Sequence, residues 1–169
     1  MSLGTAIPVR PRTDEPPALP QVSGYEVQSV CGEGAMGTVW RAIQLGTRRL
    51  VALKLMRSHV FASEKARMRF DREVELTARL DHPNIARVYD SGVHQGVFYY
   101  AMELIDGVPL DAYVEHHHLS RQQILSLFKV ICEALEHAHL RGVIHRDLTP
   151  SNILVDAGGH PHPRGYLTA

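Results

Sequence analysis

The chain has 169 residues, of which 44% are hydrophobic and 21% charged, so it is long and apolar enough to form one domain-sized core. Its 18 Lys and Arg balance its 18 Asp and Glu, which argues against nucleic acid or an anionic membrane as the main partner. Its two cysteines are far apart in the sequence, which argues against a disulfide framework and a zinc knuckle. It has no apolar run long enough for a membrane span and no signal-peptide pattern, so we expect a cytoplasmic protein.

The first segment, residues 1–22, contains five prolines and few large apolar side chains. Such a segment buries too little surface to offset the entropy that it would lose on ordering. We therefore predict a disordered tail over residues 1–22. A polyproline arm that binds a partner is the alternative, and proline content is the only feature that favours it.

Glycine-separated segments of β-type residues begin at Tyr25. They predict an antiparallel meander with strands over residues 25–30, 38–44 and 50–56. The first two strands flank the motif G-E-G-A-M-G at residues 32–37, whose backbone can approach phosphate oxygens and donate N–H groups to them. A Rossmann dinucleotide turn would need a helix directly after this motif. Residues 38–42 resemble a strand instead, so a phosphate-binding hairpin is favoured.

Lys54 lies near the end of the third predicted strand. A lone lysine at a strand end usually reaches out to solvent. Glu73 follows 19 residues later in a helix predicted over residues 61–80, and this spacing argues against the solvent-exposed interpretation. Glu75 lies on another face of the same helix and is the less favoured partner. The helix ends before Pro83, because the residue before a proline leaves the helical conformation.

Two further strands, over residues 85–91 and 97–103, complete a predicted five-stranded sheet. A short helix over residues 110–115 and a long one over residues 121–140 follow. The apolar stripe of the long helix, predicted to be a core face, consists of Ile124, Leu127, Phe128, Ile131 and Leu135. Three consecutive histidines at 116–118 cannot all face one ion, so a solvated loop is favoured over a metal site.

The segment V-I-H-R-D-L-T-P-S-N-I-L-V at residues 143–155 leads from the long helix into a short apolar strand. Its Asp147 stands five positions before Asn152, so a candidate proton acceptor lies beside a candidate Mg²⁺ ligand on one loop. This arrangement suits phosphoryl transfer. A polar loop that caps a buried helix is the alternative.

These motifs, in this order and spacing from Tyr25 to about Val155, resemble the bacterial eukaryotic-like (Hanks-type) Ser/Thr protein kinases. The resemblance implies an α+β, protein-kinase-like fold, with a complete five-stranded N-lobe that carries one helix and a partial helical C-lobe. The implied domains are the N-lobe and hinge over residues 23–105, the partial C-lobe with its catalytic loop over 106–156, and an aberrant tail over 157–169.

The resemblance also implies ATP and Mg²⁺ as cofactors and a Ser or Thr hydroxyl of a protein as the phosphoryl acceptor. Asp147 is implied as the base that accepts the hydroxyl proton, and Asn152 as a Mg²⁺ ligand. Lys54 is implied to contact the α- and β-phosphates, and Glu73 to hold this lysine.

A larger set of residues is implied to bind the nucleotide through the glycine hairpin, two apolar walls around the adenine, a gatekeeper at Met102 and a hinge that includes Leu104. These residues are Gly32, Glu33, Gly34, Ala35, Met36, Gly37, Val39, Ala52, Lys54, Met102, Glu103, Ile105 and Leu154. Val39, Ala52 and Leu154 would be buried in any folded protein, so they distinguish poorly between a binding site and plain core packing.

Two departures from the family pattern affect the predicted chemistry. Thr149 stands where Ser/Thr kinases carry a lysine, and the loss of one such charge costs on the order of 10²-fold in rate. The family's Asp-Phe-Gly would begin near position 165, but no Asp follows Asp156, so we expect a chain truncated before that motif. The long helix would then lack its covering helices, which predicts marginal stability or a partner that covers it. A nucleotide-binding pseudokinase or regulatory module and a non-functional remnant are the alternatives.

Overall fold

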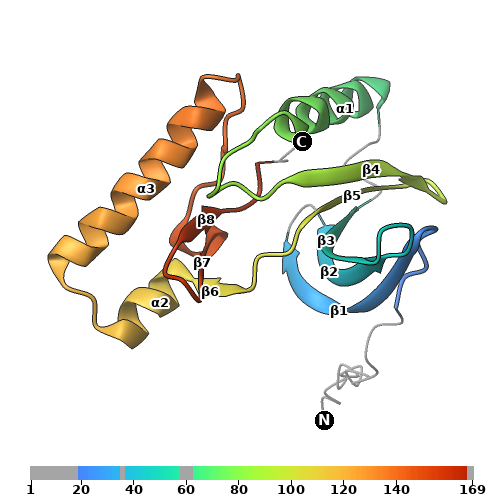
Figure 1. Ribbon diagram of the computed structural model, residues 1–169. Helices are drawn as coiled ribbons and strands as arrows, with labels where there is room; N and C mark the ends of the chain where they lie inside the picture. Colours follow the sequence, from blue (N-terminus) through green and yellow to red (C-terminus); the bar gives the residue numbers. More distant parts are fainter. Residues whose placement is uncertain (1–18, 35–36, 58–62, 167–169) are drawn as a thin grey trace, which may run out of the picture.

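The computed structural model describes residues 19–34, 37–57 and 63–166. Within these residues the chain forms two units, a five-stranded sheet with one helix and a second unit of two α-helices around a small sheet (Figure 1). Most of the predicted disordered tail lies outside the described residues. Its last residue, Val22, is buried and bridges Tyr25, so the tail prediction is wrong at that end.

The large sheet is antiparallel throughout, with the strand order β1-β2-β3-β5-β4. Its strands are β1 (Tyr25–Gly34), β2 (Gly37–Gln44), β3 (Arg49–Met56), β4 (Val88–His94) and β5 (Val97–Glu103). The five-stranded sheet of the sequence prediction is confirmed. The strand predicted from residue 85 begins three residues later, because Ile85 closes a turn onto the His82 carbonyl and is buried in a different core cluster.

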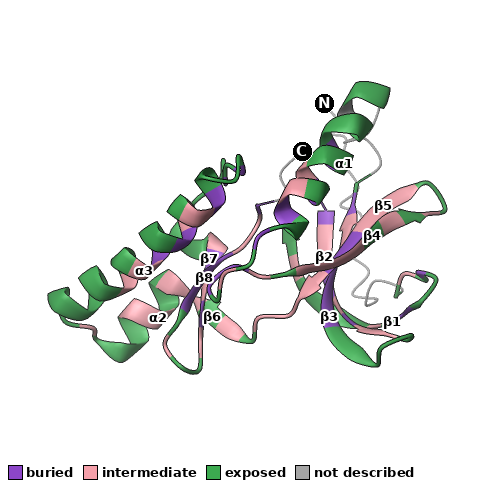
Figure 2. Ribbon diagram, turned by 45° about the horizontal axis from the view of Figure 1, so that its top comes forward, coloured by how far each residue is buried: buried purple, intermediate pink, exposed green. Residues whose placement is uncertain are grey.

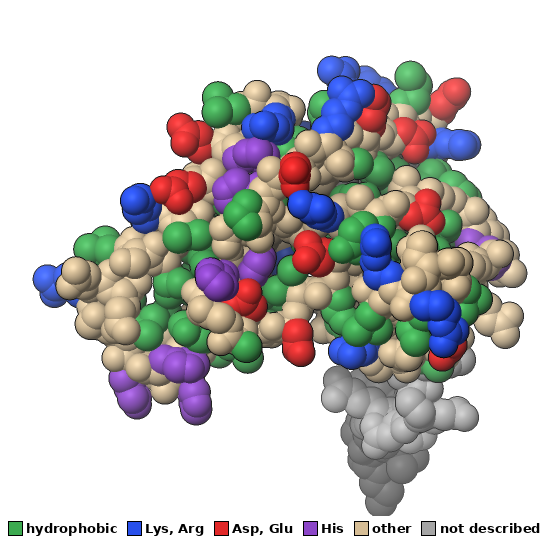
Figure 3. Space-filling model, viewed as in Figure 1, with side chains coloured by type: hydrophobic (Ala, Val, Ile, Leu, Met, Phe, Trp, Pro, Cys, Tyr) green, Lys and Arg blue, Asp and Glu red, His purple; other side chains and the backbone are tan. Residues whose placement is uncertain are grey.

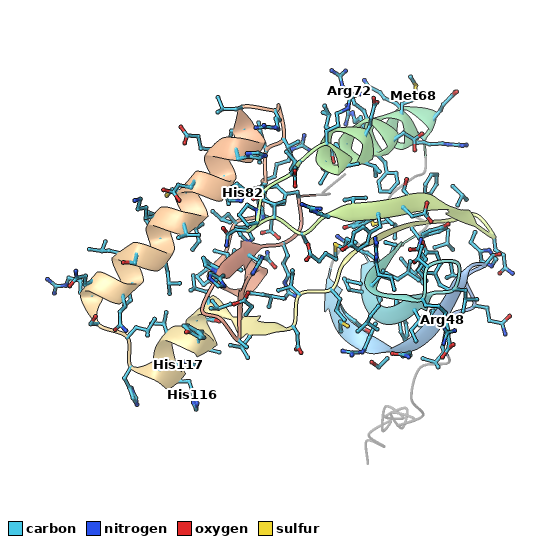
Figure 4. All side chains as sticks on the ribbon, in the orientation of Figure 1. Arg48, Met68, Arg72, His82, His116 and His117 are labelled. Atoms are coloured by element: carbon cyan, nitrogen blue, oxygen red, sulfur yellow. The ribbon has the colours of Figure 1, made fainter. Side chains whose placement is uncertain are left out.

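The two faces of this sheet bury separate clusters, as expected for strands whose successive side chains point to opposite faces. One cluster consists of Val22, Tyr25, Trp40, Ala42, Val51, Leu53 and Ala101. The other face packs against α1 (Glu64–Ala78), where Phe70 and Val74 contact Met56 and Tyr100. Figure 4 shows Met68 and Arg72 of α1 pointing away from the sheet. The helix therefore covers the sheet with one stripe only.

The second unit contains a three-stranded sheet with the order β6-β7-β8. Its strands are β6 (Gly107–Pro109), β7 (Ile153–Asp156) and β8 (Pro161–Pro163). Neither β6 nor β8 was predicted, and residues 157–169 were interpreted as an aberrant tail. That interpretation is wrong for β8, which is fully buried and pairs with β7. Proline cannot donate to a strand ladder, but β8 is an edge strand, where proline is tolerated.

The helix α2 (Leu110–His117) extends two residues beyond its predicted end. His116 and His117 therefore lie in its last turn rather than in a loop, and both are exposed (Figures 3 and 4). The ring of His117 stacks on Tyr113 at 4.1 Å between centroids, and its Nδ1 lies 3.0 Å from the Tyr113 carbonyl oxygen. These contacts explain why the helix continues into the histidines.

The long helix α3 (Arg121–His139) begins with a capping box, in which Ser120 and Gln123 bond each other's backbone. Only its C-terminal half packs into the core, through Ile131, Ala134 and Ala138. Phe128 is 62% exposed, and Ile124 is also exposed, so the predicted core stripe is wrong in the N-terminal half (Figure 2). Part of its apolar surface is thus open to solvent, as the sequence predicted. Among the described helices, none is long and apolar enough to cross a membrane.

Candidate functional site

A cavity of about 840 Å³ lies between the large sheet and the loop that follows α3. It brings together residues from four strands of the large sheet, including the glycine motif, from the segment after β5 and from the second unit. The predicted site residues that line it are Gly32, Glu33, Gly34, Gly37, Val39, Ala52, Lys54, Met102, Glu103, Ile105, Asp147, Asn152 and Leu154. Ala35 and Met36 lie outside the described residues, and Glu73 is not among the lining residues.

The glycine motif forms the hairpin between β1 and β2, whose pairing runs to Gly34 opposite Gly37. No helix opens after it, so the Rossmann alternative is excluded. A Cβ atom on Gly37 would lie 2.1 Å from the Leu55 carbonyl oxygen on β3, so only glycine fits there. Gly32 and Gly34 have open space around their Cα atoms, which leaves their backbone accessible from the cavity.

One end of the cavity is apolar. Ala52 is only 4% exposed and pairs in register with Met102, so the β3 and β5 backbones are held side by side there. Val39 lines the cavity from β2 and Leu154 from β7, on the opposite unit. The chain leaves β5 through Glu103, whose N–H donates to the Arg87 carbonyl at 2.8 Å. This geometry offers a flat apolar slot beside a backbone segment.

The other end is charged. Lys54 extends from β3, and its Nζ lies 5.6 Å from the centroid of the Tyr100 ring. Burial lowers the pKa of Lys54, and the positive charge of Arg164 lowers it further. A lysine perturbed in this way, beside a second cation in a cavity, marks a candidate site for an anionic ligand.

The predicted pairing of Lys54 with Glu73 is not formed in this structure. Glu73 accepts a hydrogen bond from Arg146 at 2.6 Å, and the ion pairs among the described residues include none between Lys54 and Glu73. Arg146 reaches α1 because its backbone is left-handed, with φ of 61°, which turns its side chain towards the helix. The second carboxylate oxygen of Glu73 is buried with no hydrogen-bond partner.

The loop after α3 holds Asp147 and Asn152 together. The Asn152 amide nitrogen donates to the Asp147 carbonyl at 2.9 Å and to its carboxylate at 3.0 Å. His145 is buried below them and its Nε2 lies 2.8 Å from the Arg164 carbonyl oxygen, while burial lowers its pKa. The carboxylate of Asp147 is thereby fixed at the mouth of the cavity, where it can accept a proton.

Few side chains at the charged end of the cavity could bind a metal ion. The family pattern would have an Asp ligand near position 165, where this chain carries Gly165, and the cation Arg164 precedes it. No three His, Cys, Asp or Glu side chains come close enough to hold an ion in the part of the chain that the structure describes. Asp147 and Asn152, which are bonded to each other, offer side-chain oxygens at the charged end. These residues do not fit the two-metal arrangement of the protein kinases.

Sequence reasoning missed three contributors to this site. Arg146 was not assigned as the partner of Glu73, and Arg164 was assigned to the aberrant tail. Tyr166 is buried against His145, with ring centroids 4.8 Å apart and planes at 73°. For Arg164 and Tyr166 the signal in the sequence was their spacing after Asn152, which places them where the family's Asp-Phe-Gly would begin.

Comparisons with known proteins agree with this geometry. A family model described as "Protein kinase domain" matches residues 25–162. The chain is 38% identical to serine/threonine-protein kinase pkn3 of Myxococcus xanthus and 34% identical to serine/threonine-protein kinase PrkC of Bacillus subtilis. These matches cover 86% and 83% of the chain, which spans only 27% and 22% of the two relatives.

Among solved structures, the kinase domain of Mycobacterium tuberculosis PknI is similar, with a TM-score of 0.76 and 30% identity. The match covers 88% of this chain and 62% of the PknI chain. The sequence expectation of a fold of this kind, with a five-stranded sheet and one helix against it, is confirmed.

Proposed function

The chain belongs to the protein kinase family, and we propose that it binds ATP in the cavity and transfers the γ-phosphoryl group to a Ser or Thr hydroxyl of a protein. The observation that carries this proposal is the meeting of the glycine hairpin, Lys54 and Asp147 around one cavity. Three motifs that are far apart in the sequence converge there. The relatives named above are serine/threonine kinases, which supports the same class of reaction.

The nucleoside is proposed to enter the apolar end. Adenine is a flat ring system, and the slot between Val39 and Ala52 on one side and Leu154 on the other matches it in shape and polarity. The backbone from Glu103 to Ile105 runs along the edge of this slot and offers polar groups that can fix the ring orientation. Met102 limits the depth of the slot behind the ring.

The phosphates then point towards Lys54 and the glycine hairpin. Asp147 accepts the proton of the acceptor hydroxyl while that oxygen forms its bond to the γ-phosphorus. The bond from the γ-phosphorus to the bridging oxygen breaks, and ADP leaves with the electron pair. Asn152 keeps the Asp147 carboxylate in place through the contact at 3.0 Å.

Two Mg²⁺ ions accompany ATP in the protein kinases and spread the charge of the phosphates. In that arrangement Asn152 would be a ligand of one of them. The carboxylate that would hold the second ion in the family is absent at position 165, where this chain has Gly165. The described donors therefore do not complete the arrangement of the family.

A second candidate function is nucleotide binding without transfer, as in a pseudokinase that regulates a partner. Two observations favour it. Thr149 is exposed on the loop beside Asp147 and adds no positive charge where the family has a lysine. Gly165 supplies no metal ligand. Both changes weaken the chemistry and leave the apolar slot intact.

The test measures phosphate transfer from labelled ATP to a generic basic protein, together with ATP affinity by calorimetry. Asp147→Asn should lower transfer by about 10² to 10⁴-fold, because a general base contributes that much, and leave ATP affinity unchanged. Asp71→Asn on the exposed face of α1 is the matched control and should change neither. ATP binding with no transfer by the unaltered chain would favour the second candidate, and no binding of ATP or adenosine would reject both.

A further inference from the structure

Arg164 is a cation at the charged end of the cavity that no catalytic role accounts for. Its backbone is fixed on both sides, since its N–H donates to the Asn152 carbonyl at 2.9 Å and its carbonyl oxygen lies 2.8 Å from His145 Nε2. Its guanidinium donates to the Ser151 carbonyl at 3.2 Å. The side chain is thus held against the loop that carries Asp147, and it lines the cavity from there.

The positive charge of Arg164 affects the pKa of two groups on the large sheet, Lys54 and Cys31. It lowers the pKa of Lys54 on β3, after burial, which is the larger cause. It also opposes the effect of burial on Cys31, whose pKa is raised by desolvation and lowered by Arg41 and Arg164. Cys31 directly precedes the glycine motif. Arg164 lines the same cavity as Lys54 and the glycine hairpin, which is the cavity assigned above to the nucleotide.

The set of side chains that would bind a metal ion at this end of the cavity is incomplete. Asn152 uses its amide nitrogen on Asp147, which leaves its amide oxygen and the Asp147 carboxylate as side-chain oxygens on this loop that could bind an ion. Position 165 is glycine, and a guanidinium stands next to it. A fixed cation repels a divalent ion, whereas it attracts the same phosphate oxygens that the ion would bind.

We propose that Arg164, together with Lys54, binds the phosphates of the nucleotide directly, so that the cavity takes a nucleoside triphosphate without a divalent cation. This inference rests on the proposed function, because it assumes that the nucleotide occupies this cavity. A guanidinium offers several N–H donors in one plane, which match two phosphate oxygens at once. Lys54 adds a point charge from the opposite wall.

The first measurement compares the affinity of the unaltered chain for ATP by calorimetry in excess Mg²⁺ and in excess EDTA. We expect the two dissociation constants to agree within about threefold, because the two fixed cations replace the ion. A loss of binding in EDTA of more than about thirtyfold would overturn the proposal, since it would show that the metal ion is required. This comparison needs no variant and so does not depend on whether a variant folds.

The second measurement tests Arg164 itself. Arg164→Gln should weaken ATP binding in EDTA by about tenfold, as expected for one charge-assisted contact, and leave adenosine binding unchanged. Arg164→Lys should restore part of the loss. Arg79→Gln is the matched control, because Arg79 is exposed, pairs with Glu75 on α1 and does not line the cavity.

The outcomes separate this inference from the function on which it rests. Unchanged ATP affinity in Arg164→Gln, with the fold verified by the fluorescence of the single tryptophan, would overturn the role of Arg164. Adenosine binding that persists while ATP binds only with Mg²⁺ would overturn the inference and keep the nucleotide site. Failure of both adenosine and ATP to bind under all conditions would reject the proposed function and the inference with it.

Discussion

At its apolar end the cavity is lined by residues of regular strands in continuous register, whereas at its charged end it is lined largely by residues of loops. Ala52 and Met102 are backed by the packed core between the sheet and α1. Asp147 and Arg164 are held by a few hydrogen bonds among residues 145–164. The apolar end agrees with the family pattern, and every departure from it lies at the charged end. Binding of a nucleoside and chemistry on its phosphates therefore depend on different parts of the molecule.

The largest expected effect comes from Tyr100, which is 1% exposed and lies on β5, the strand that carries Met102 at the apolar end. Its ring packs against Phe70 at 6.3 Å between centroids. Tyr100→Ala should lower the free energy of unfolding by about 3 to 5 kcal/mol, because it removes a large buried ring and leaves a cavity. Urea unfolding followed by the fluorescence of Trp40 measures this, since Trp40 is the single tryptophan and is buried.

The matched control for this prediction is a change at the charged end. Thr149 is exposed, so Thr149→Lys should alter the free energy of unfolding by no more than about 0.5 kcal/mol. If Tyr100→Ala and Thr149→Lys lower the free energy of unfolding equally, the two ends do not differ in their contribution to stability, and the comparison fails.

Thr149→Lys should instead act on transfer, which is the next largest effect. A lysine there places a positive charge beside Asp147 and should raise the rate of phosphate transfer by about 10²-fold. Nucleotide affinity should change little, because adenine binds at the other end. Steady-state transfer to a basic protein, with Thr149→Gln as the uncharged control of similar length, measures the gain. An equal gain in both variants would contradict an electrostatic cause.

The sequence predicted the apolar end well because strands and glycine turns are local patterns. Val39, Ala52 and Met102, which the resemblance implied as nucleotide-binding residues, line the cavity from β2, β3 and β5. The charged end was predicted less completely, since its contacts depend on how two units meet. The bond of Arg146 to Glu73 joins residues 73 positions apart, and nothing in either segment distinguishes that pair from Lys54 and Glu73. The strand β8 was missed because its two prolines are signals against a strand unless its edge position is known.

A smaller effect is expected from the pair of Arg146 and Glu73, which connects the loop to α1. Arg146 is more than half exposed, so the pair is screened by solvent and its coupling should be about 0.5 to 1 kcal/mol. A double-mutant cycle of Arg146→Gln and Glu73→Gln in urea measures this coupling. The pair of Arg79 and Glu75 on α1 is the control and should couple by about 0.3 to 0.5 kcal/mol. Additive effects of the first two variants would show that the loop is not held through Glu73.

The smallest effect concerns the turn after β7, which joins Leu154 at the apolar end to Arg164 at the charged end. Asp156 is the centre of this turn, and its Oδ1 accepts from the N–H groups of Gly158 and His160 at 2.8 and 2.9 Å. Burial raises its pKa, but hydrogen bonds from His160 and His162 and the charge of His160 outweigh that effect and lower the pKa to about 2.

Because the folded pKa lies below the ordinary value of 3.8, the ionised carboxylate stabilises the fold above pH 3.8, and this contribution is lost as the pH falls through about 2. Asp156→Asn should therefore lower the free energy of unfolding by about 0.5 to 1 kcal/mol near neutral pH and have no effect near pH 2. Urea unfolding of both chains across this range measures the difference, with Asp71→Asn as the control for net charge. If the two chains still differ in free energy of unfolding near pH 2, the Asp156 side chain stabilises the turn through its packing rather than its charge. The two ends of the cavity would then be joined by packing alone.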